Sequence, residues 1–293
     1  MKYKLITDSC VDIPDKLAKE LELKVLPLKF TVKGQEYANY LDNREITPAE
    51  FYKLMREQNT AITAQLNPND FVEALTPLLK EGYDILYLAF SSALSGTYSS
   101  SVIAKKQLSE EFPERRIEVI DTLAASMGQG LLVTLAARKH LEGMSLDDLI
   151  KYVENTKNNV CHLFTVSDLG HLRRGGRLSA SSLVLGNLLN IKPLLHVNLN
   201  GELKVYGKAR GRFKSLNNLI SRMEETFDKT NNKVVYISHG DCLDDAIYVK
   251  NNLIEKLGLK EEQFLINYVG PVIGAHSGVN TLAIFYLGNE RTY

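Results

Sequence analysis

The sequence contains few cysteines, and these are too widely separated to suggest a disulfide framework or a metal site. Its three cysteines are Cys10, Cys161 and Cys242, and no two of them form a Cys-x-x-Cys pair. Scattered thiols of this kind are typical of a reducing compartment. The histidines also lack a ligand spacing such as His-Glu-x-x-His, so we expect no metal ion.

Net charge and long apolar segments are lacking as well. Lysine plus arginine number 35, and aspartate plus glutamate also number 35. No overall field would therefore attract nucleic acid or an acidic membrane. No segment approaches the ~20 apolar residues of a membrane-spanning helix, and the N-terminus lacks the apolar run of a signal peptide. We expect a cytoplasmic protein that does not bind nucleic acid.

The known nucleotide-binding loops and the hydrolase elbow are absent from the sequence. The chain has no GxxxxGK[ST] loop, no GxGxxG fingerprint and no GxSxG motif. These motifs cradle phosphates or expose a nucleophilic serine. Their absence disfavours a kinase, a nucleotide-binding enzyme and an α/β-hydrolase.

What the sequence does contain is an alternation of strand and helix signals over a length that suits two domains. In the first half, apolar runs at 4–7, 84–90 and 116–120 predict strands. Residues 25–32 and 36–40 predict a hairpin with its turn at Gly34. Helices are predicted from residue 12 to 22, from Thr47 to 58, and at 68–81, 96–112, 124–141 and 146–153.

The second half repeats this alternation. Strands are predicted at 161–166, 233–238, 264–269 and 281–287, with a hairpin at 194–208 and helices at 180–189, 212–227 and 243–257. We therefore expect an α/β protein of two α/β/α three-layer domains with parallel or mixed sheets. The expected domains comprise residues 1–157 and 158–293.

A cluster of hydroxyls follows the apolar run at 84–90. Ser95, Gly96 and Thr97 stand between this predicted strand and a long helix. The first amides of a helix lack internal partners, and glycine lets an anion approach them, so the segment can form an anion site. Simple helix capping by the serine and threonine is the alternative.

Two further segments offer polar groups after or before predicted elements. Residues 270–278 are glycine-rich, which predicts a loop, and they place His276 after a strand. An imidazole there can donate to a carboxylate, which in turn favours the charged ring. Thr63 and Gln65 lie in a predicted loop before a helix. A structural histidine and helix capping are the respective alternatives.

Arginines gather in two glycine-containing segments. Arg173, Arg174 and Arg177 surround Gly175 and Gly176, and Arg210 precedes a helix. Arginines beside glycine can form forked hydrogen bonds with a partner's carboxylates or phosphates. The alternative is a solvated loop.

Taken together, these segments resemble the DegV family, whose best-understood members are the fatty-acid-binding subunits of bacterial fatty acid kinase. The resemblance covers essentially the whole chain. It rests on six motifs in the family's order: Ile6-Thr7-Asp8-Ser9, Asp12-Ile13-Pro14, Thr63-Ala64-Gln65, Ser95-Gly96-Thr97, Gly175-Gly176-Arg177 and the segment from Gly270 to His276.

The resemblance implies a fatty acid buried in an apolar tunnel between two α/β domains, with its carboxylate near their junction. Thr63, Ser95 and His276 would surround the carboxylate, with the amide of Gly96 as a further donor and Gln65 nearby. The chain would have no catalytic residue and no cofactor. A separate kinase subunit would phosphorylate the carboxylate, and this subunit would face the basic residues Arg173, Arg174, Arg177 and Arg210. The acyl phosphate would then pass to phospholipid synthesis, a role that permits transient membrane contact.

The physical chemistry of a fatty acid agrees with a binding protein. Burial of some fifteen methylenes, at about 0.8 kcal/mol each, yields on the order of 12 kcal/mol before the costs of association. A buried carboxylate without partners costs several kcal/mol, so hydroxyl, amide and imidazole donors are what the head group requires.

Two alternatives remain open from the sequence. One is a serine-dependent acyl hydrolase or transferase with Ser95 as nucleophile and His276 as base, although no third orienting residue is evident. The other is a lipid-responsive regulatory protein whose arginine segments dock a partner.

Overall fold

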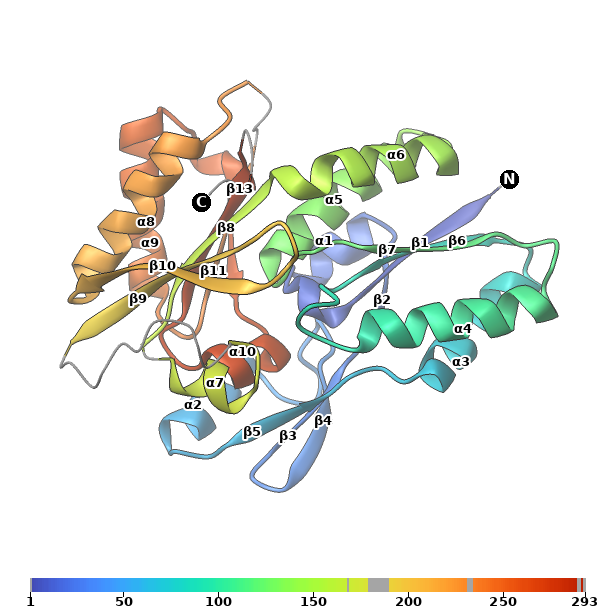
Figure 1. The fold of residues 1–293 in the computed structure, drawn as a ribbon, viewed down its shortest axis with the longest axis horizontal. Coiled ribbons are helices and arrows are strands. Elements are labelled where there is room, and N and C mark those ends of the chain that lie inside the picture. Colours follow the sequence, from blue (N-terminus) through green and yellow to red (C-terminus); the bar gives the residue numbers. More distant parts are fainter. Residues whose placement is uncertain (1, 168, 179–189, 231–233, 289–290, 292–293) are drawn as a thin grey trace.

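The computed structural model describes residues 2–167, 169–178, 190–230, 234–288 and 291, and within them it has three β-sheets surrounded by helices (Figure 1). The first sheet is parallel and lies in the first half of the chain. Its strands, in spatial order, are β2 (Lys24–Leu26), β1 (Tyr3–Asp8), β6 (Asp84–Ala89) and β7 (Ile117–Asp121). Strand β6 is buried along its whole length, as its continuous apolar sequence predicts.

The second sheet is mixed and belongs to the second half of the chain. Strands β11 and β12 are parallel, and every other neighbouring pair in the sheet is antiparallel. In spatial order the strands are β10 (Leu203–Arg210), β9 (Ile191–Val197), β8 (Val160–Thr165), β13 (Leu282–Leu287), β11 (Val235–His239) and β12 (Phe264–Tyr268).

A small antiparallel sheet projects from the first half of the chain. It consists of β4 (Gln35–Ala38), β3 (Lys29–Val32) and β5 (Ala61–Ala64). Strands β3 and β4 confirm the predicted hairpin. Its two turn residues, Lys33 and Gly34, have φ values of 52° and 78°, as a two-residue type I′ turn requires.

Helices cover the outer faces of both large sheets. The ten α-helices of the described residues are α1 (Asp15–Glu20), α2 (Pro48–Arg56), α3 (Pro68–Lys80), α4 (Thr97–Glu111), α5 (Met127–Leu141), α6 (Leu146–Thr156), α7 (Gly170–Arg174), α8 (Arg212–Thr226), α9 (Leu243–Leu257) and α10 (Pro271–Ser277). The predicted capping box of α2 is present, since the Thr47 hydroxyl accepts from the Glu50 amide and the Glu50 carboxylate accepts from the Thr47 amide.

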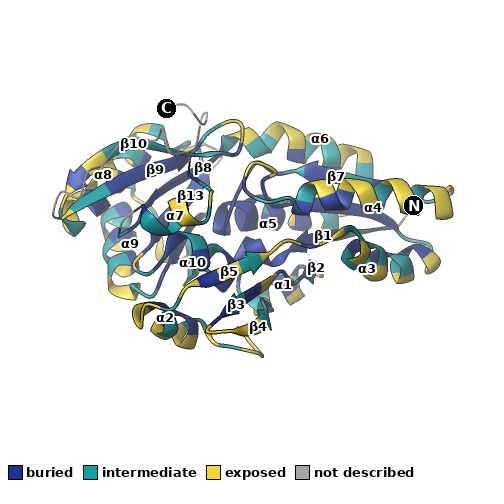
Figure 2. Ribbon diagram, turned by 60° about the horizontal axis from the view of Figure 1, so that its bottom comes forward, coloured by how far each residue is buried: buried dark blue, intermediate teal, exposed yellow. Residues whose placement is uncertain are grey.

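Helix α5 lies between the two large sheets and packs on both (Figures 1 and 2). It contacts β8, β11 and β13 on one side and β1 on the other, and ten of its residues are buried. Helices α8 and α9 cover the opposite face of the six-stranded sheet, while α3 and α4 contact β6 and β7. One apolar cluster therefore runs across α5 and includes Leu5, Leu131 and Phe285.

The structure corrects the sequence analysis in three places around the later site. Residues 25–32 form two strands in different sheets, because Pro27 separates β2 from β3 and cannot donate a ladder hydrogen bond. Thr63 lies in strand β5 instead of a loop. The glycine-rich segment before His276 is helix α10, with Pro271 in its first turn.

Some expectations lie beyond what the structure describes. The helix predicted at 180–189 falls outside the described residues. The division at residues 157 and 158 stays a prediction, since the apolar cluster around α5 joins both halves. None of the helices in the described ranges is long and apolar enough to span a bilayer.

Candidate functional site

An apolar cavity of about 810 Å³, counted out to its opening, lies where the two halves of the chain meet. Its walls come from loops that follow β2, β6 and β7, from β5, α7 and α10, and from one face of the six-stranded sheet. Most of the lining side chains are apolar, among them Leu28, Phe90, Phe164, Val272 and Phe285.

The six-stranded sheet supplies the floor of the cavity. Ala283 of β13 is paired with Phe164 of β8 on one side and with Ser238 of β11 on the other, and Phe285 is paired with His162. Directly opposed residues of neighbouring strands point to the same face of a sheet. All five side chains therefore face the cavity, and four of them present carbon or a ring.

His162 gives the floor its shape and has no free nitrogen for a ligand. Its Nε2 accepts a hydrogen bond from the Ala125 amide at 3.2 Å, so Nδ1 carries the proton and donates to the Val160 carbonyl at 3.0 Å. Burial and the nearby charge of Arg291 hold the pKa of His162 well below its usual value. The ring is therefore neutral and already fully hydrogen-bonded.

Polar groups gather where β5, α4, α7 and α10 meet at the cavity wall. Thr63 Oγ1 lies 2.8 Å from His276 Nε2, which joins β5 to α10. The imidazole also rests against α7, because a Cβ built on Gly175 would lie only 2.1 Å from His276 Nδ1. The glycine at this position is therefore what lets the histidine ring approach the helix end.

Ser95 and Gln65 face the same region from the start of α4 and the end of β5. The Ser95 hydroxyl accepts from the Thr97 amide at 3.2 Å and lies 2.9 Å from Thr97 Oγ1. Part of the capping alternative thus holds for Ser95. The Gln65 amide covers Gly96, where an added Cβ would lie 2.1 Å from Oε1. Gln65 is exposed, so the cavity opens on this side.

The electrostatics of this region favour an anion. Burial first, and then the positive charge of Arg177 and the neighbouring His171, lower the pKa of His276 to about 4. His276 is therefore neutral at pH 7 in the empty protein. Arg177 is half-buried in the cavity wall, where its Nε donates to the Leu94 carbonyl at 2.9 Å. A carboxylate would find a cation and several hydroxyls within one apolar enclosure.

The loop carrying Ser95 is held by a buried carboxylate of the first strand. Asp8 Oδ2 accepts from the Phe90 amide at 2.9 Å and from the Tyr87 hydroxyl at 2.7 Å, while Oδ1 accepts from the Cys10 amide. Ser9 Oγ accepts from the Leu28 amide at 3.0 Å. Asp8 and Ser9 of the Ile6-Thr7-Asp8-Ser9 motif thus position two walls of the cavity.

The structure brings together most of the residues that the sequence nominated for a carboxylate. Thr63, Gln65, Ser95 and His276 all line the cavity. Gly96 lies behind them, under the Gln65 side chain. Among the nominated docking residues, Arg173, Arg174 and Arg210 are exposed, whereas Arg177 is in the cavity wall.

Sequence reasoning missed four hydroxyls of the cavity wall, those of Ser126, Ser238, Ser277 and Thr281. The Thr281 hydroxyl donates to the Gly278 carbonyl at 2.8 Å. Ser277 is buried, and its Oγ has no hydrogen-bond partner within the described residues. Ser126 and Ser238 are buried as well, and they lie 3.2 Å apart. The sequence did offer a signal for Ser277, because this residue directly follows His276. No local pattern marked Ser126 and Ser238, because the fold alone brings them together.

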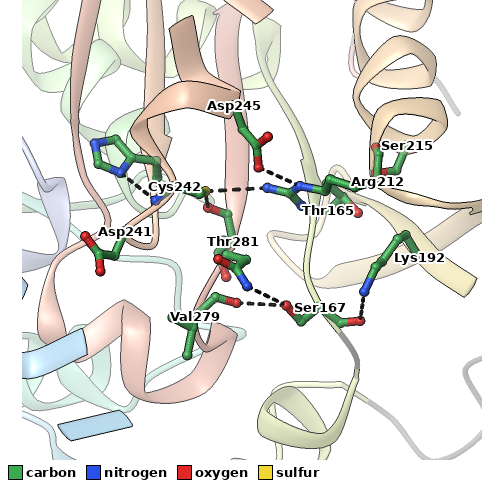
Figure 3. Close-up of polar contacts among 12 residues, drawn as sticks. Thr165, Ser167, Lys192, Arg212, Ser215, Asp241, Cys242, Asp245, Val279 and Thr281 are labelled. Carbon is green, nitrogen blue, oxygen red and sulfur yellow. Dashed lines mark hydrogen bonds and ion pairs between the residues drawn. The ribbon is translucent and has the colours of Figure 1, made fainter. Parts of the chain in front are cut away.

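A second polar cluster lies at the carboxyl ends of β8 and β11 (Figure 3). Arg212 Nε donates to Asp245 Oδ2 at 2.8 Å, and the Cys242 thiol donates to the Thr281 carbonyl at 3.4 Å. Burial raises the pKa of Cys242 to about 12. Because only the thiolate is an effective nucleophile, Cys242 belongs to a structural network.

The geometry also bears on the serine-nucleophile alternative. His276 makes its side-chain hydrogen bond to Thr63, whereas Ser95 bonds to Thr97. The pairing that would activate Ser95 is therefore not formed in this structure.

Comparison with known proteins gives matches along essentially the whole chain. The sequence profile described as "Uncharacterised protein, DegV family" matches residues 2–289. A DegV domain-containing protein of Clostridium perfringens is 44% identical over 290 residues, which cover 99% of each chain.

Two solved structures are also similar. One, described as fatty acid binding of a DegV family protein from Thermus thermophilus, is 32% identical with a TM-score of 0.86 and covers 98% of this chain and 100% of that one. The other, a fatty acid binding DegV family protein of Streptococcus agalactiae, is 30% identical with a TM-score of 0.85 and covers 99% of this chain and 100% of that one.

Proposed function

The chain belongs to the DegV family, and we propose that it binds one long-chain fatty acid in the apolar cavity, with the carboxylate against Thr63, Ser95 and His276. The observation that carries this proposal is one enclosed cavity whose apolar walls end at a group of donors. Burial of the acyl chain supplies the affinity, at about 0.8 kcal/mol per methylene. The donors determine which end of the ligand lies at the opening.

Similar solved structures support the ligand class. The proteins from Thermus thermophilus and Streptococcus agalactiae, both described as fatty acid binding, share this fold over nearly their full length. The hydroxyls and the imidazole come from three separate segments, and their convergence at one cavity wall is what an acid requires.

We further propose that the chain acts as a carrier without catalysis of its own, and that a separate kinase subunit phosphorylates the bound carboxylate for phospholipid synthesis. The sequence has no nucleotide-binding loop of known type. The exposed Arg173 and Arg174 end the helix whose Gly175 touches His276. A docked partner would therefore lie close to the carboxylate. Residues 1–157 and 158–293 would then act as two units that hold the ligand between them.

Extraction of the purified protein tests the proposed ligand. Organic extracts analysed by mass spectrometry should contain long-chain fatty acid in about equimolar amount, and delipidated protein should take up added fatty acid. An extract without lipid, together with no uptake, would refute the proposal.

Charge reversal tests the proposed kinase contact separately. Arg173→Glu with Arg174→Glu should abolish phosphorylation of the bound acid by a fatty acid kinase subunit while fatty acid affinity is retained. The matched control is charge reversal at Lys16, an exposed residue of α1. Unchanged phosphorylation in the double variant would remove these arginines from the contact.

A further inference from the structure

Two serines place their hydroxyl groups in an otherwise apolar part of the cavity wall. Ser238 lies on the floor strand β11, and Ser126 lies at the start of α5, across the junction of the two halves. Their hydroxyl oxygens are 3.2 Å apart, and Ser238 and Ser126 are only 0% and 5% exposed, respectively. A hydroxyl buried in such a wall lowers the stability of the protein unless it makes a hydrogen bond.

A buried carboxylate stands behind this pair. Ser126 Oγ donates to Asp12 Oδ2 at 2.6 Å, and Asp12 is 3% exposed. The Asp12 backbone is held by a hydrogen bond from the Asn267 side chain to its carbonyl, and the carboxylate packs against Gly270, where an added Cβ would lie 2.4 Å from Oδ1. The three side chains thus form a line from Asp12 through Ser126 to Ser238 at the cavity wall.

The number of available protons decides which group donates each hydrogen bond between these three side chains. Burial raises the pKa of Asp12 to about 7, so at pH 8 its carboxylate is ionised and accepts the single hydrogen of the Ser126 hydroxyl. The contact between the serines is therefore a hydrogen bond that Ser238 donates to Ser126. The oxygen of Ser238 keeps lone pairs that accept from no donor within the described residues. It can accept a hydrogen bond from a group inside the cavity.

Ser126 also has an unusual backbone conformation. Its φ is 51° and its ψ is −144°, a region that a residue other than glycine occupies at a cost of about 1–3 kcal/mol. This conformation directs the Ser126 side chain toward Asp12 and Ser238 instead of into the first turn of α5. Strain of this kind is concentrated at ligand sites.

From this arrangement we propose that Ser238, supported by Ser126 and Asp12, is a subsite for a hydroxyl group on the acyl chain, and that the cavity favours hydroxylated over plain long-chain fatty acids. This inference rests on the proposed function. A ligand hydroxyl would donate to Ser238, which places the preferred hydroxyl at one position along the chain. A ketone at the same carbon has no proton to donate and would leave the subsite unmatched.

Competition binding to delipidated protein at pH 8 tests this subsite. The ligands are octadecanoic acid, its monohydroxy isomers with the hydroxyl at successive carbons, and the keto analogue of the best isomer. We expect one isomer to bind about threefold to tenfold more tightly than octadecanoic acid, the ratio that one net hydrogen bond supports. The keto analogue should bind more weakly than this isomer.

Variants of the two serines complete the test. Ser238→Ala should abolish the preference. Ser126→Gly, which suits the positive φ, should keep the preference for a hydroxyl but lose the discrimination against the keto analogue, because Ser238 could then donate its own proton to the ketone. Ser109→Ala, in the part of α4 remote from the cavity, should keep both the preference and the discrimination.

The outcomes separate this inference from the proposed function. Failure of every fatty acid to bind would overturn the proposed function itself. Tight binding of octadecanoic acid, with every hydroxy isomer weaker by the same ratio in wild type and Ser238→Ala, would overturn only the hydroxyl subsite. The serine pair would then serve only to join the two halves.

Discussion

At the level of single side chains, the carboxylate end of the cavity depends on a few donors set into a largely apolar wall. Thr63 and His276 are joined by a 2.8 Å contact, and Ser95 faces the same space from the start of α4. Each donor is worth about 1.5–3 kcal/mol when it bonds to a charged group. Loss of any one should therefore be measurable in affinity.

Ser95→Ala should weaken fatty acid binding by about tenfold, since it removes one hydrogen bond to the carboxylate. Ser109→Ala serves as the control, because Ser109 lies in α4, the helix that follows Ser95, but does not line the cavity. Competition with a fluorescent fatty acid measures both. Equal affinities for the two variants would remove Ser95 from the site.

The protonation of His276 should depend on the ligand. Burial and Arg177 lower its pKa to about 4 in the empty protein, and an adjacent carboxylate would raise that pKa. The complex would then bind a proton that the free protein does not, so affinity should rise as pH falls through the raised pKa.

Histidine NMR titration with and without ligand measures this effect, and His276→Gln assigns the signal. In the empty protein the His276 resonance should stay constant from pH 8 down to about 5.5 and titrate near pH 4. In the complex its midpoint should move upward. An identical low midpoint in both states would place the carboxylate away from His276.

At the scale of elements, the approach of α7 to α10 positions the imidazole. Gly175 has an ordinary helical conformation, but a Cβ there would lie 2.1 Å from His276 Nδ1. Gly176 has a φ of 70°, and a Cβ added to it would meet no described atom within 4 Å, so its requirement is conformational. Adjacent glycines thus have different roles.

Gly175→Ala should therefore lower fatty acid affinity, whereas Gly176→Ala should lower stability. The first should displace His276 from Thr63 and reduce fatty acid affinity at least tenfold with little loss of stability. The second should cost about 1–2 kcal/mol of unfolding free energy through backbone strain and leave affinity unchanged. Urea unfolding and ligand competition measure the two quantities. A Gly175→Ala variant with normal affinity would show that the ring can move without consequence.

The same elements show where sequence reasoning succeeds and where it stops. Long periodic segments such as α3, α8 and α9 were predicted near their observed bounds, because burial on one face leaves a clear pattern. Helix α10 was predicted as a loop because of its glycines. Gly274 is there for another reason: an added Cβ would lie 2.6 Å from the Tyr52 hydroxyl of α2. Close packing required the glycine, and the sequence does not reveal the neighbour.

The site residues likewise fall into two groups, those that the sequence identified and those that only the fold brings together. Resemblance identified Thr63, Ser95 and His276, which do share one cavity wall. It assigned Arg177 to partner docking together with its neighbours; in the structure Arg177 is half-buried in the cavity wall, beside Leu94 and His276. Asp12, Ser126 and Ser238 come from three distant segments. Contacts of such long sequence separation depend on how the halves meet, which local patterns do not encode.

For the whole molecule, the cavity means that the junction of the two halves is incompletely filled. Ala283 lies at the centre of its floor, between Phe164 and Ser238. Ala283→Leu should fill part of this apolar space, so thermal stability should be unchanged or higher while fatty acid affinity falls at least tenfold.

A matched substitution in a filled core gives the contrast. Ala246 of α9 is fully buried and packed among the apolar residues behind the sheet, so Ala246→Leu should cost about 1–3 kcal/mol. Thermal unfolding of both variants in the delipidated state measures the difference. Equal destabilisation would show that no fillable space lies over Ala283.

The most direct test of the central claim is a calorimetric titration of delipidated protein with octadecanoic acid at several temperatures. Burial of an acyl chain in the cavity predicts one saturable site per chain with a negative heat-capacity change, because apolar surface leaves water on binding. The absence of a saturable site, or binding without a heat-capacity change, would contradict the account.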